Sequence, residues 1–168
     1  MSVEEHKSEA PVTIGCAVIT VSDTRTDATD KSGKLLKELL IENGHNIPFY
    51  KIVKDDPASI KATVEEAIST KEVSTILMTG GTGIAKRDVT IETVSTLFEK
   101  EIVGFGELFR MLSYLEDIGS AAMMSRASAG IYRNKAIFIM PGSSGAVKLA
   151  MEKLILKEMG HVVRELNK

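Results

Sequence analysis

The sequence predicts a three-layer α/β fold with a mainly parallel central sheet. Short, β-branched apolar runs alternate along the chain with segments of helical periodicity. Two of these runs are apolar almost throughout, as in strands that helices cover on both faces. The length of 168 residues suits a single domain, because one core of this size can bury roughly two thirds of the unfolded surface.

The first predicted unit is a strand, a loop and a helix. Residues 1–11 are polar and charged, and we expect them to form a flexible tail before a domain that spans residues 12–168. A continuous apolar, β-branched run predicts a strand over residues 12–21. The helix follows between Asp30 and Gly44, where leucines recur at helical spacing and glycine is typical of a helix end.

The same order recurs in the next part of the chain. A strand is predicted over residues 47–53, and a helix begins after it with Asp56 as the N-cap and Pro57 as the first helical residue. A third strand, over residues 74–78, precedes a glycine-rich loop and a helix from about residue 90 to residue 98. Strands that alternate with helices in this way imply a parallel sheet with helices on both faces.

The second half of the chain begins with a helix predicted over residues 104–116. This helix carries more apolar residues than one buried face requires. The excess, together with Met123 and Met124, is a candidate subunit interface, and core packing is the alternative explanation. A turn at residues 133–135 and a strand over residues 136–140 follow. A Pro-Gly turn then opens a long final helix, predicted from residue 145 to about residue 158.

Composition limits the partners that this protein can have. The 21 basic and 23 acidic residues nearly cancel, which argues against nucleic acid, because a polyanion requires a positive surplus. No apolar run approaches the ~20 residues that span a bilayer, and the first ten residues lack the apolar stretch of a signal peptide. We therefore expect a cytoplasmic protein without a membrane partner.

The metal-ligating side chains also limit the chemistry. Cys16 is the only cysteine and lies in an apolar run, where we expect it to be a small buried hydrophobe. The three histidines are far apart in the sequence and lack the spacing of zinc ligands. The composition therefore argues against a structural zinc site.

Loops with chemically special residues follow four of the predicted strands. They occupy residues 22–25, 55–56, 79–83 and 141–144. In an open parallel sheet, ligands bind beyond the carboxyl ends of the strands. We therefore expect these loops to converge on one site.

The loop over residues 79–88 has the composition of a phosphate-binding loop. Its glycines let backbone N–H groups approach a phosphate, and its threonines and cations add donors and positive charge. It is neither a Walker A loop nor a dinucleotide fingerprint, which requires a third glycine where Lys86 stands. A tight glycine turn without a ligand is the alternative. The candidate phosphate-binding residues of this loop are Thr79, Gly80, Gly81, Thr82, Gly83, Lys86 and Arg87.

Three carboxylates stand at the predicted loop edge, namely Asp23, Asp55 and Asp88. Together with substrate phosphates they provide enough oxygen ligands for one magnesium ion. Asp56, in contrast, has a sufficient structural role as a helix cap.

Five ordered motifs resemble those of the MoaB/Mog molybdopterin-binding family of molybdenum cofactor biosynthesis. These motifs are Thr-Val-Ser-Asp at residues 20–23, Asp-Lys-Ser-Gly at residues 30–33, the glycine loop and the residues after it at 79–90, Ser-Arg-x-x-x-Gly at residues 125–130, and Pro-Gly at residues 141–142. The resemblance covers about residues 12–166, which is nearly the whole chain.

The resemblance implies a three-layer α/β domain that assembles as a trimer or hexamer. It further implies a molybdopterin adenylyltransferase, a nucleotidyltransferase that uses Mg²⁺ and ATP to adenylylate the phosphate of molybdopterin and releases pyrophosphate. By matching positions, Asp55 and Asp88 would be the two essential, metal-binding aspartates of the family. The resemblance also implies that the turn formed by Pro141, Gly142, Ser143 and Ser144 binds the nucleotide together with the glycine loop. The residues that would face molybdopterin are Ser22, Asp23, Ser32, Gly33, Ser125 and Arg126. The product could pass to a partner that inserts molybdate.

Two details bear on catalytic activity. The Arg87-Asp88 pair of the glycine loop is intact, which favours a working enzyme. Ser143 and Ser144 replace the Asn-Pro that follows Pro-Gly in Mog-type members, and the segment over residues 105–111 is similar to MoaB. The alternative is therefore a non-catalytic molybdopterin-binding or carrier protein.

Overall fold

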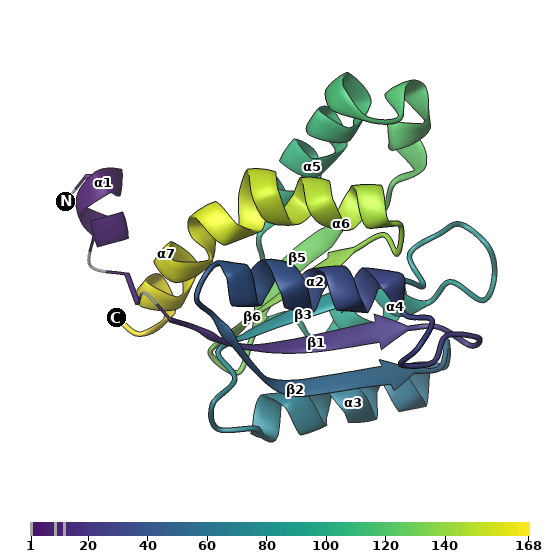
Figure 1. The fold of residues 1–168 in the computed structure, drawn as a ribbon, viewed down its shortest axis with the longest axis horizontal. Helices are drawn as coiled ribbons and strands as arrows, with labels where there is room; N and C mark the ends of the chain where they lie inside the picture. Colours follow the sequence, from purple (N-terminus) through teal and green to yellow (C-terminus); the bar gives the residue numbers. More distant parts are fainter. Residues whose placement is uncertain (1, 9, 12) are drawn as a thin grey trace.

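A computed structural model of the chain describes residues 2–8, 10–11 and 13–168, with the backbone alone at residue 6. Within these residues a six-stranded sheet lies between two layers of helices, in the order β2-β1-β3-β6-β5-β4 (Figure 1). The strands are β1 (Gly15–Val21), β2 (Asn46–Val53), β3 (Thr75–Thr79), β4 (Lys100–Glu101), β5 (Ser128–Tyr132) and β6 (Lys135–Met140). The first four strands in spatial order run parallel, and β5 is antiparallel to both of its neighbours. The predicted fold class is confirmed.

Strand β1 lies between β2 and β3 and is buried over nearly its whole length. The chain passes from β1 outward to β2 and then returns to β3 on the other side of β1. Such a reversal is a topological switch point, where open α/β sheets bind their ligands. The strand was predicted to start at residue 12, which lies outside the described residues, and it begins at Gly15 instead.

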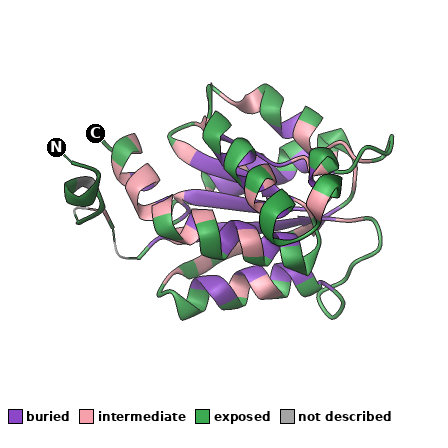
Figure 2. Ribbon diagram, turned by 90° about the horizontal axis from the view of Figure 1, so that it is seen from above, coloured by how far each residue is buried: buried purple, intermediate pink, exposed green. Residues whose placement is uncertain are grey.

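The helices form two layers, one on each face of the sheet. One apolar core lies beneath α2 (Lys31–Glu42), α5 (Val103–Glu116), α6 (Ser144–Ala150) and α7 (Leu156–Leu166). A second core lies beneath α3 (Pro57–Ser69) and α4 (Thr90–Val94) on the opposite face. In Figure 2 the strands are almost entirely buried between helices whose outer faces are exposed. This burial on both faces explains why the strands are apolar throughout.

The two predicted helix starts are confirmed. The Asp30 carboxylate caps α2 by accepting a hydrogen bond of 3.0 Å from the Gly33 amide. The Asp56 carboxylate caps α3 by accepting from the Ser59 amide at 2.9 Å, and Pro57 is the first helical residue. Hydrogen bonds from the Ser59 amide and hydroxyl hold the pKa of Asp56 below its ordinary value.

The sequence analysis missed strands β4 and β5. Strand β5 joins β6 through the predicted turn, in which Arg133 and Asn134 both have positive φ angles, 45° and 61°. Two such residues form a tight turn whose twist suits a hairpin, so this turn was the available signal for β5. Strand β4 comprises two exposed, charged residues and has no apolar pattern to detect.

Two predicted helices differ from the observed ones. The helix expected over residues 90–98 ends at Val94, and a 3₁₀ turn, η1 (Ser95–Leu97), follows it. The final helix extends past residue 158 to Leu166, through a π-helical turn, η3 (Met151–Ile155). It continues because Met159 and Val163 are buried and prolong its apolar face.

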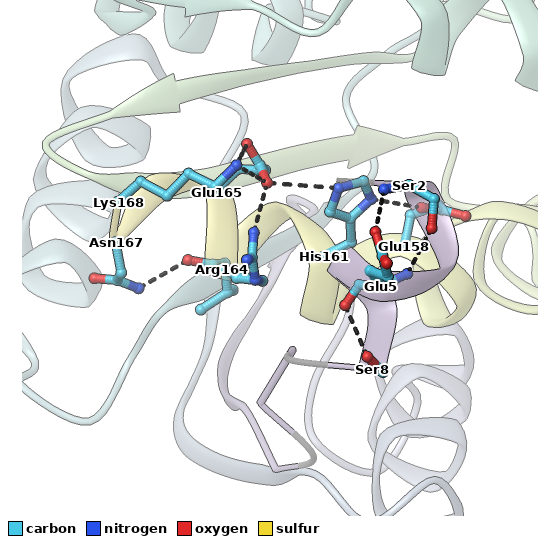
Figure 3. A network of polar contacts seen from close by, with 10 residues as sticks. Ser2, Glu5, Ser8, Glu158, His161, Arg164, Glu165, Asn167 and Lys168 are labelled. Carbon is cyan, nitrogen blue, oxygen red and sulfur yellow. Dashed lines mark hydrogen bonds and ion pairs between the residues drawn. The ribbon is translucent and has the colours of Figure 1, made fainter.

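The N-terminal segment that was expected to be a flexible tail contains a short helix, α1 (Val3–Ser8), beside α7. Residues 1 and 9 of this segment lie outside the described residues. An ion pair of 2.5 Å joins Lys7 to Glu158. Figure 3 shows His161 between two carboxylates of α7, at 3.3 Å from Glu158 and 3.7 Å from Glu165. These contacts lie at the end of the sheet opposite to the glycine loop (Figure 1).

Two further expectations concern membranes and cysteine chemistry. No helix in the described part of the chain is long and apolar enough to cross a membrane.

Cys16 is buried as predicted, and burial raises the pKa of its thiol to about 12. The thiol is therefore protonated at neutral pH and unsuited to nucleophilic chemistry.

Candidate functional site

A cleft of about 200 Å³ opens at the carboxyl ends of β1 and β3, at the switch point of the sheet. Its walls come from the end of β1, from the loops after β1 and β2, and from the glycine loop after β3. The lining residues are Val21, Ser22, Asp23, Thr24, Asp55, Gly81, Arg87 and Asp88. A larger hollow of about 550 Å³ shares Ser22 and Asp23 with this cleft and continues along β2. The structure therefore brings together the predicted loops after β1, β2 and β3.

The glycine loop leaves β3 with a backbone that only glycine adopts easily. Gly80 and Gly81 have φ angles of +90° and +65°. A Cβ atom on Gly80 would lie 2.3 Å from the carbonyl oxygen of Val21, which closes β1. The two strand ends are thus packed directly against each other, with no room for a side chain between them.

Three consecutive carbonyl groups of this loop accept hydrogen bonds, two from the start of α4 and one from the segment before β5. The Gly80 and Gly81 oxygens accept hydrogen bonds from the hydroxyl and the amide of Thr90, at 2.9 and 3.0 Å. The Thr82 oxygen accepts from Nε of Arg126 at 2.9 Å. These bonds fix the direction of the peptide groups along the loop.

Three consecutive amide groups of the same loop, in contrast, have no partner within the described part of the chain. Among the described residues, no acceptor is bonded to the N–H groups of Gly81, Thr82 and Gly83. Successive N–H groups in a turn of this kind form a concave donor surface that suits an anion. The loop therefore keeps three N–H groups able to donate to an anion, and Gly81 among these residues lines the cleft.

Three carboxylates and one guanidinium meet at the cleft. The Asp55 amide donates to Oδ1 of Asp23 at 3.0 Å, and Oδ2 of Asp88 accepts from the Ala85 amide at 3.2 Å. Burial, followed by the nearby charges of Asp23 and Asp88, raises the pKa of Asp55 above its ordinary value, while Arg87 opposes this shift. A bound cation would relieve this crowding of negative charge.

The donor set of the cleft fits a magnesium ion that is shared with phosphates. Among the residues that the structure describes, no three His, Cys, Asp or Glu side chains form a ready metal site. Mg²⁺ usually takes only one or two protein carboxylates and completes its shell with phosphate oxygens and water. Asp55 and Asp88 both line the cleft and could supply such a pair.

Two predicted molybdopterin-facing residues, Ser32 and Gly33, are buried in the first turn of α2. The Ser32 hydroxyl lies 3.2 Å from the hydroxyl of Thr79, and the Gly33 amide donates to Asp30. The buried Asp30 carboxylate also accepts from the hydroxyls of Thr20 and Tyr50, at 2.7 and 2.6 Å. In this structure these groups tie α2 to three strands.

The Tyr50 phenol belongs to this buried network. Burial and the hydrogen bond to Asp30 raise the pKa of Tyr50 above its ordinary value. The phenol is therefore a stable donor to the Asp30 carboxylate at neutral pH.

The Pro-Gly turn lies against the glycine loop. A Cβ atom on Gly142 would lie 3.3 Å from the Cα atom of Gly80, and the Gly80 amide donates to the Met140 carbonyl at 3.2 Å. Ser143 caps α6 by accepting from the Ala146 amide at 3.2 Å. The loop after β6 therefore joins the other three at this edge of the sheet, as predicted.

Three predicted site residues are not among those that line the cleft, namely Lys86, Ser125 and Arg126. Lys86 is exposed, and Ser125 and Arg126 are half-buried. The guanidinium of Arg126 is bonded to the Thr82 carbonyl and paired with Glu92.

Sequence reasoning missed two residues that contact this part of the site, Glu92 and Thr90. Glu92 had no detectable signal, because an exposed glutamate in a first helical turn is commonplace. Thr90 was placed at the helix start and at the end of the glycine-loop motif, without a role in the site, and its two bonds to the loop depend on tertiary structure.

The fold and the cleft together define a doubly wound α/β protein whose candidate ligand site lies at a topological switch point. A family model described as a probable molybdopterin binding domain matches residues 17–161. The chain belongs to the MoaB/Mog molybdopterin-binding family, and the resemblance found in its motifs is confirmed.

Individual relatives agree with this assignment. Molybdenum cofactor biosynthesis protein B of Bacillus cereus is 61% identical over 168 residues, which is 100% of this chain and 99% of the relative. A crystal structure of a molybdenum cofactor biosynthesis protein B has a TM-score of 0.92 at 60% identity and covers 95% of this chain and 99% of its own. The tungsten cofactor synthesizing protein MoaB from Pyrococcus furiosus has a TM-score of 0.85 at 40% identity, covering 95% and 100%.

Proposed function

We propose that this protein acts in molybdenum cofactor biosynthesis as an adenylyltransferase that uses MgATP and molybdopterin. The observation that carries the proposal is the glycine loop, whose carbonyl groups are bonded and whose amides at Gly81, Thr82 and Gly83 have no acceptor among the described residues. This loop borders a cleft that also holds Asp55 and Asp88. Family membership and the named roles of the relatives support molybdopterin as the second substrate.

The reaction joins two phosphates and requires little acid–base chemistry. An oxygen of the molybdopterin phosphate attacks the α-phosphorus of ATP and forms a new P–O bond. The bond from this phosphorus to the oxygen that bridges to the β-phosphorus breaks, and that oxygen leaves with the electron pair as part of pyrophosphate. Because the nucleophile is already an anion, catalysis depends on positioning and on neutralisation of charge.

The residues of the cleft have separate roles in this proposal. The free amides of the glycine loop hold the nucleotide phosphates, and Lys86 and Arg87 add positive charge beside them. Asp55 and Asp88 would hold Mg²⁺ together with phosphate oxygens, and the ion would neutralise charge on the phosphates. Ser22 and Asp23 lie where the cleft meets the larger hollow along β2 and would face molybdopterin.

A direct assay tests this function. Purified protein, incubated with molybdopterin and MgATP, is expected to release pyrophosphate and to form adenylylated molybdopterin, both of which mass spectrometry and a pyrophosphate assay detect. Removal of the metal with EDTA is expected to stop turnover, and added Mg²⁺ is expected to restore it. A protein that binds both ligands and never turns over would contradict the proposal.

The second candidate function is a non-catalytic molybdopterin carrier. The exposed Ser143-Ser144 pair favours it, because Mog-type members have Asn-Pro there. A carrier would bind molybdopterin equally well when Asp55 and Asp88 are each replaced by alanine, and it would give no MgATP-dependent product.

We also propose a trimer or hexamer of this chain, as the family resemblance implies. Helix α5 exposes Leu108, Met111 and Leu115 at helical spacing, and Met123 beyond it is 85% exposed. Figure 1 shows that α5 projects beyond the sheet. An exposed apolar face of this kind typically contacts another protein surface.

The substitution Leu115→Glu is expected to lower the molar mass measured by light scattering during gel filtration. Ile41→Glu on α2 is the matched control, because these two side chains are 66% and 63% exposed. A wild-type monomer, or equal masses for both variants, would contradict the proposed interface.

A further inference from the structure

Glu92 and Arg126 form a clamp on the glycine loop. The guanidinium of Arg126 pairs with the carboxylate of Glu92 through Nη1 and donates from Nε to the Thr82 carbonyl. Glu92 lies in the first turn of α4, and Arg126 lies just before β5. The pair therefore connects two distant parts of the chain to one peptide group of the loop.

The direction of that peptide group decides which ligand the loop can accept. A carbonyl oxygen that pointed into the cleft would repel a phosphate, whereas an N–H group that points there attracts it. The bond from Arg126 occupies the Thr82 oxygen, and the following amide, that of Gly83, is left without an acceptor among the described residues. Because the Arg126 guanidinium is also paired with Glu92, it loses less freedom when it bonds to the Thr82 carbonyl than an unpaired guanidinium would.

We propose that Glu92 is a positioning residue, which fixes Arg126 against the Thr82 carbonyl and so keeps the amides of the glycine loop available to the phosphates of the nucleotide. This inference rests on the proposed function for its ligand. The contact between Arg126 and the loop itself does not depend on that function.

The sign of the mutational effect distinguishes this role from simple electrostatics. Glu92 is a negative charge close to a site for anions. If its charge acted on the ligand directly, its removal would strengthen phosphate binding. If Glu92 acts through Arg126, its removal weakens phosphate binding although the site becomes more positive.

Binding of MgATP to Glu92→Ala, Arg126→Ala and the double variant tests the proposal by calorimetry. Each single variant is expected to bind about threefold to tenfold more weakly than the wild type, as for one charge-assisted contact. The double variant is expected to bind no more weakly than Arg126→Ala, because the two residues act in series. Glu65→Gln, which alters the remote ion pair of 3.0 Å between Glu65 and Arg133, is the matched control and is expected to bind normally.

Hydrogen exchange in the ligand-free protein gives a second, independent measurement. The Thr90 amide, which donates to the Gly81 carbonyl at 3.0 Å, is expected to exchange faster in Glu92→Ala and Arg126→Ala but not in Glu65→Gln. Tighter MgATP binding by Glu92→Ala, or unchanged exchange at Thr90, would overturn the inference. A wild type that does not bind MgATP would instead contradict the proposed function, and the exchange measurement would still decide whether the clamp exists.

Discussion

Asp88→Asn is expected to abolish adenylyl transfer and to leave the fold intact. Asp88 lines the cleft, where its carboxylate would bind Mg²⁺ beside the nucleotide phosphates. An asparagine has nearly the same shape, and its Oδ1 can still accept the hydrogen bond of 3.2 Å that the Ala85 amide donates. The variant therefore removes one negative charge and one metal ligand with little change in the loop.

The expected loss in kcat is on the order of 100-fold or more, as for the removal of one preorganised electrostatic group. Pyrophosphate release under saturating MgATP measures it, and thermal unfolding checks the fold. Asp117→Asn, at an exposed position after α5, is the control and is expected to keep full activity. If the kcat of Asp88→Asn equals that of the wild type, the metal-binding role proposed for Asp88 is wrong.

The central part of the fold was predictable because its strands carry a strong local signal. Residues such as Ile137 and Ile139 lie in a sheet covered on both faces and are completely buried, so β6 appears in the sequence as a continuous apolar run. The edge strand β4 pairs through the backbone of Lys100 and Glu101, both of them exposed. Backbone pairing of exposed residues leaves no pattern in the side chains, so β4 could not be found.

The site was predictable in its residue types and less so in its geometry. Glycines and carboxylates after buried strands indicated the cleft, because the topology of a parallel sheet brings its strand ends together. Ser32 follows Asp30 in a motif that points to the same edge, yet its side chain is buried against Thr79 at the end of β3. The direction of a side chain at a helix start depends on the packing of that helix, which a local motif does not contain.

Residues that act through another residue are the hardest to find in a sequence. Thr90 holds two loop carbonyls, and Arg126 reaches a third from a segment 44 residues away. Neither contact follows from spacing along the chain. Their effect is collective, because together they fix the peptide groups whose N–H sides make the loop a candidate phosphate site.

Gly80→Ala is expected to cause the largest loss of stability among single substitutions in the loop. The φ angle of Gly80 is +90°, outside the region that alanine adopts easily. The new Cβ atom would also lie 2.3 Å from the carbonyl oxygen of Val21. This oxygen belongs to the backbone of β1, so the clash can be relieved only if the ends of β1 and β3 separate.

Gly44→Ala provides the matched comparison, because it separates strain in the backbone from the clash. Gly44 also has a positive φ angle, +82°, but a Cβ atom there would meet nothing within 4 Å. The free energy of unfolding should therefore fall by about 1 kcal/mol for Gly44→Ala, from backbone strain alone. For Gly80→Ala the clash adds to this strain, and we expect a loss of about 3 kcal/mol or more.

Urea unfolding measures the free energies of unfolding of the two variants. Both are measured at the same protein concentration, because subunit association makes the apparent stability depend on concentration. Equal losses for the two variants would mean that the ends of β1 and β3 can move apart at little cost. In that case the cleft between them would not be rigid. The preorganised amides of the glycine loop could then no longer explain phosphate binding, because preorganisation requires that the loop and the Val21 end of β1 keep their positions before the ligand arrives.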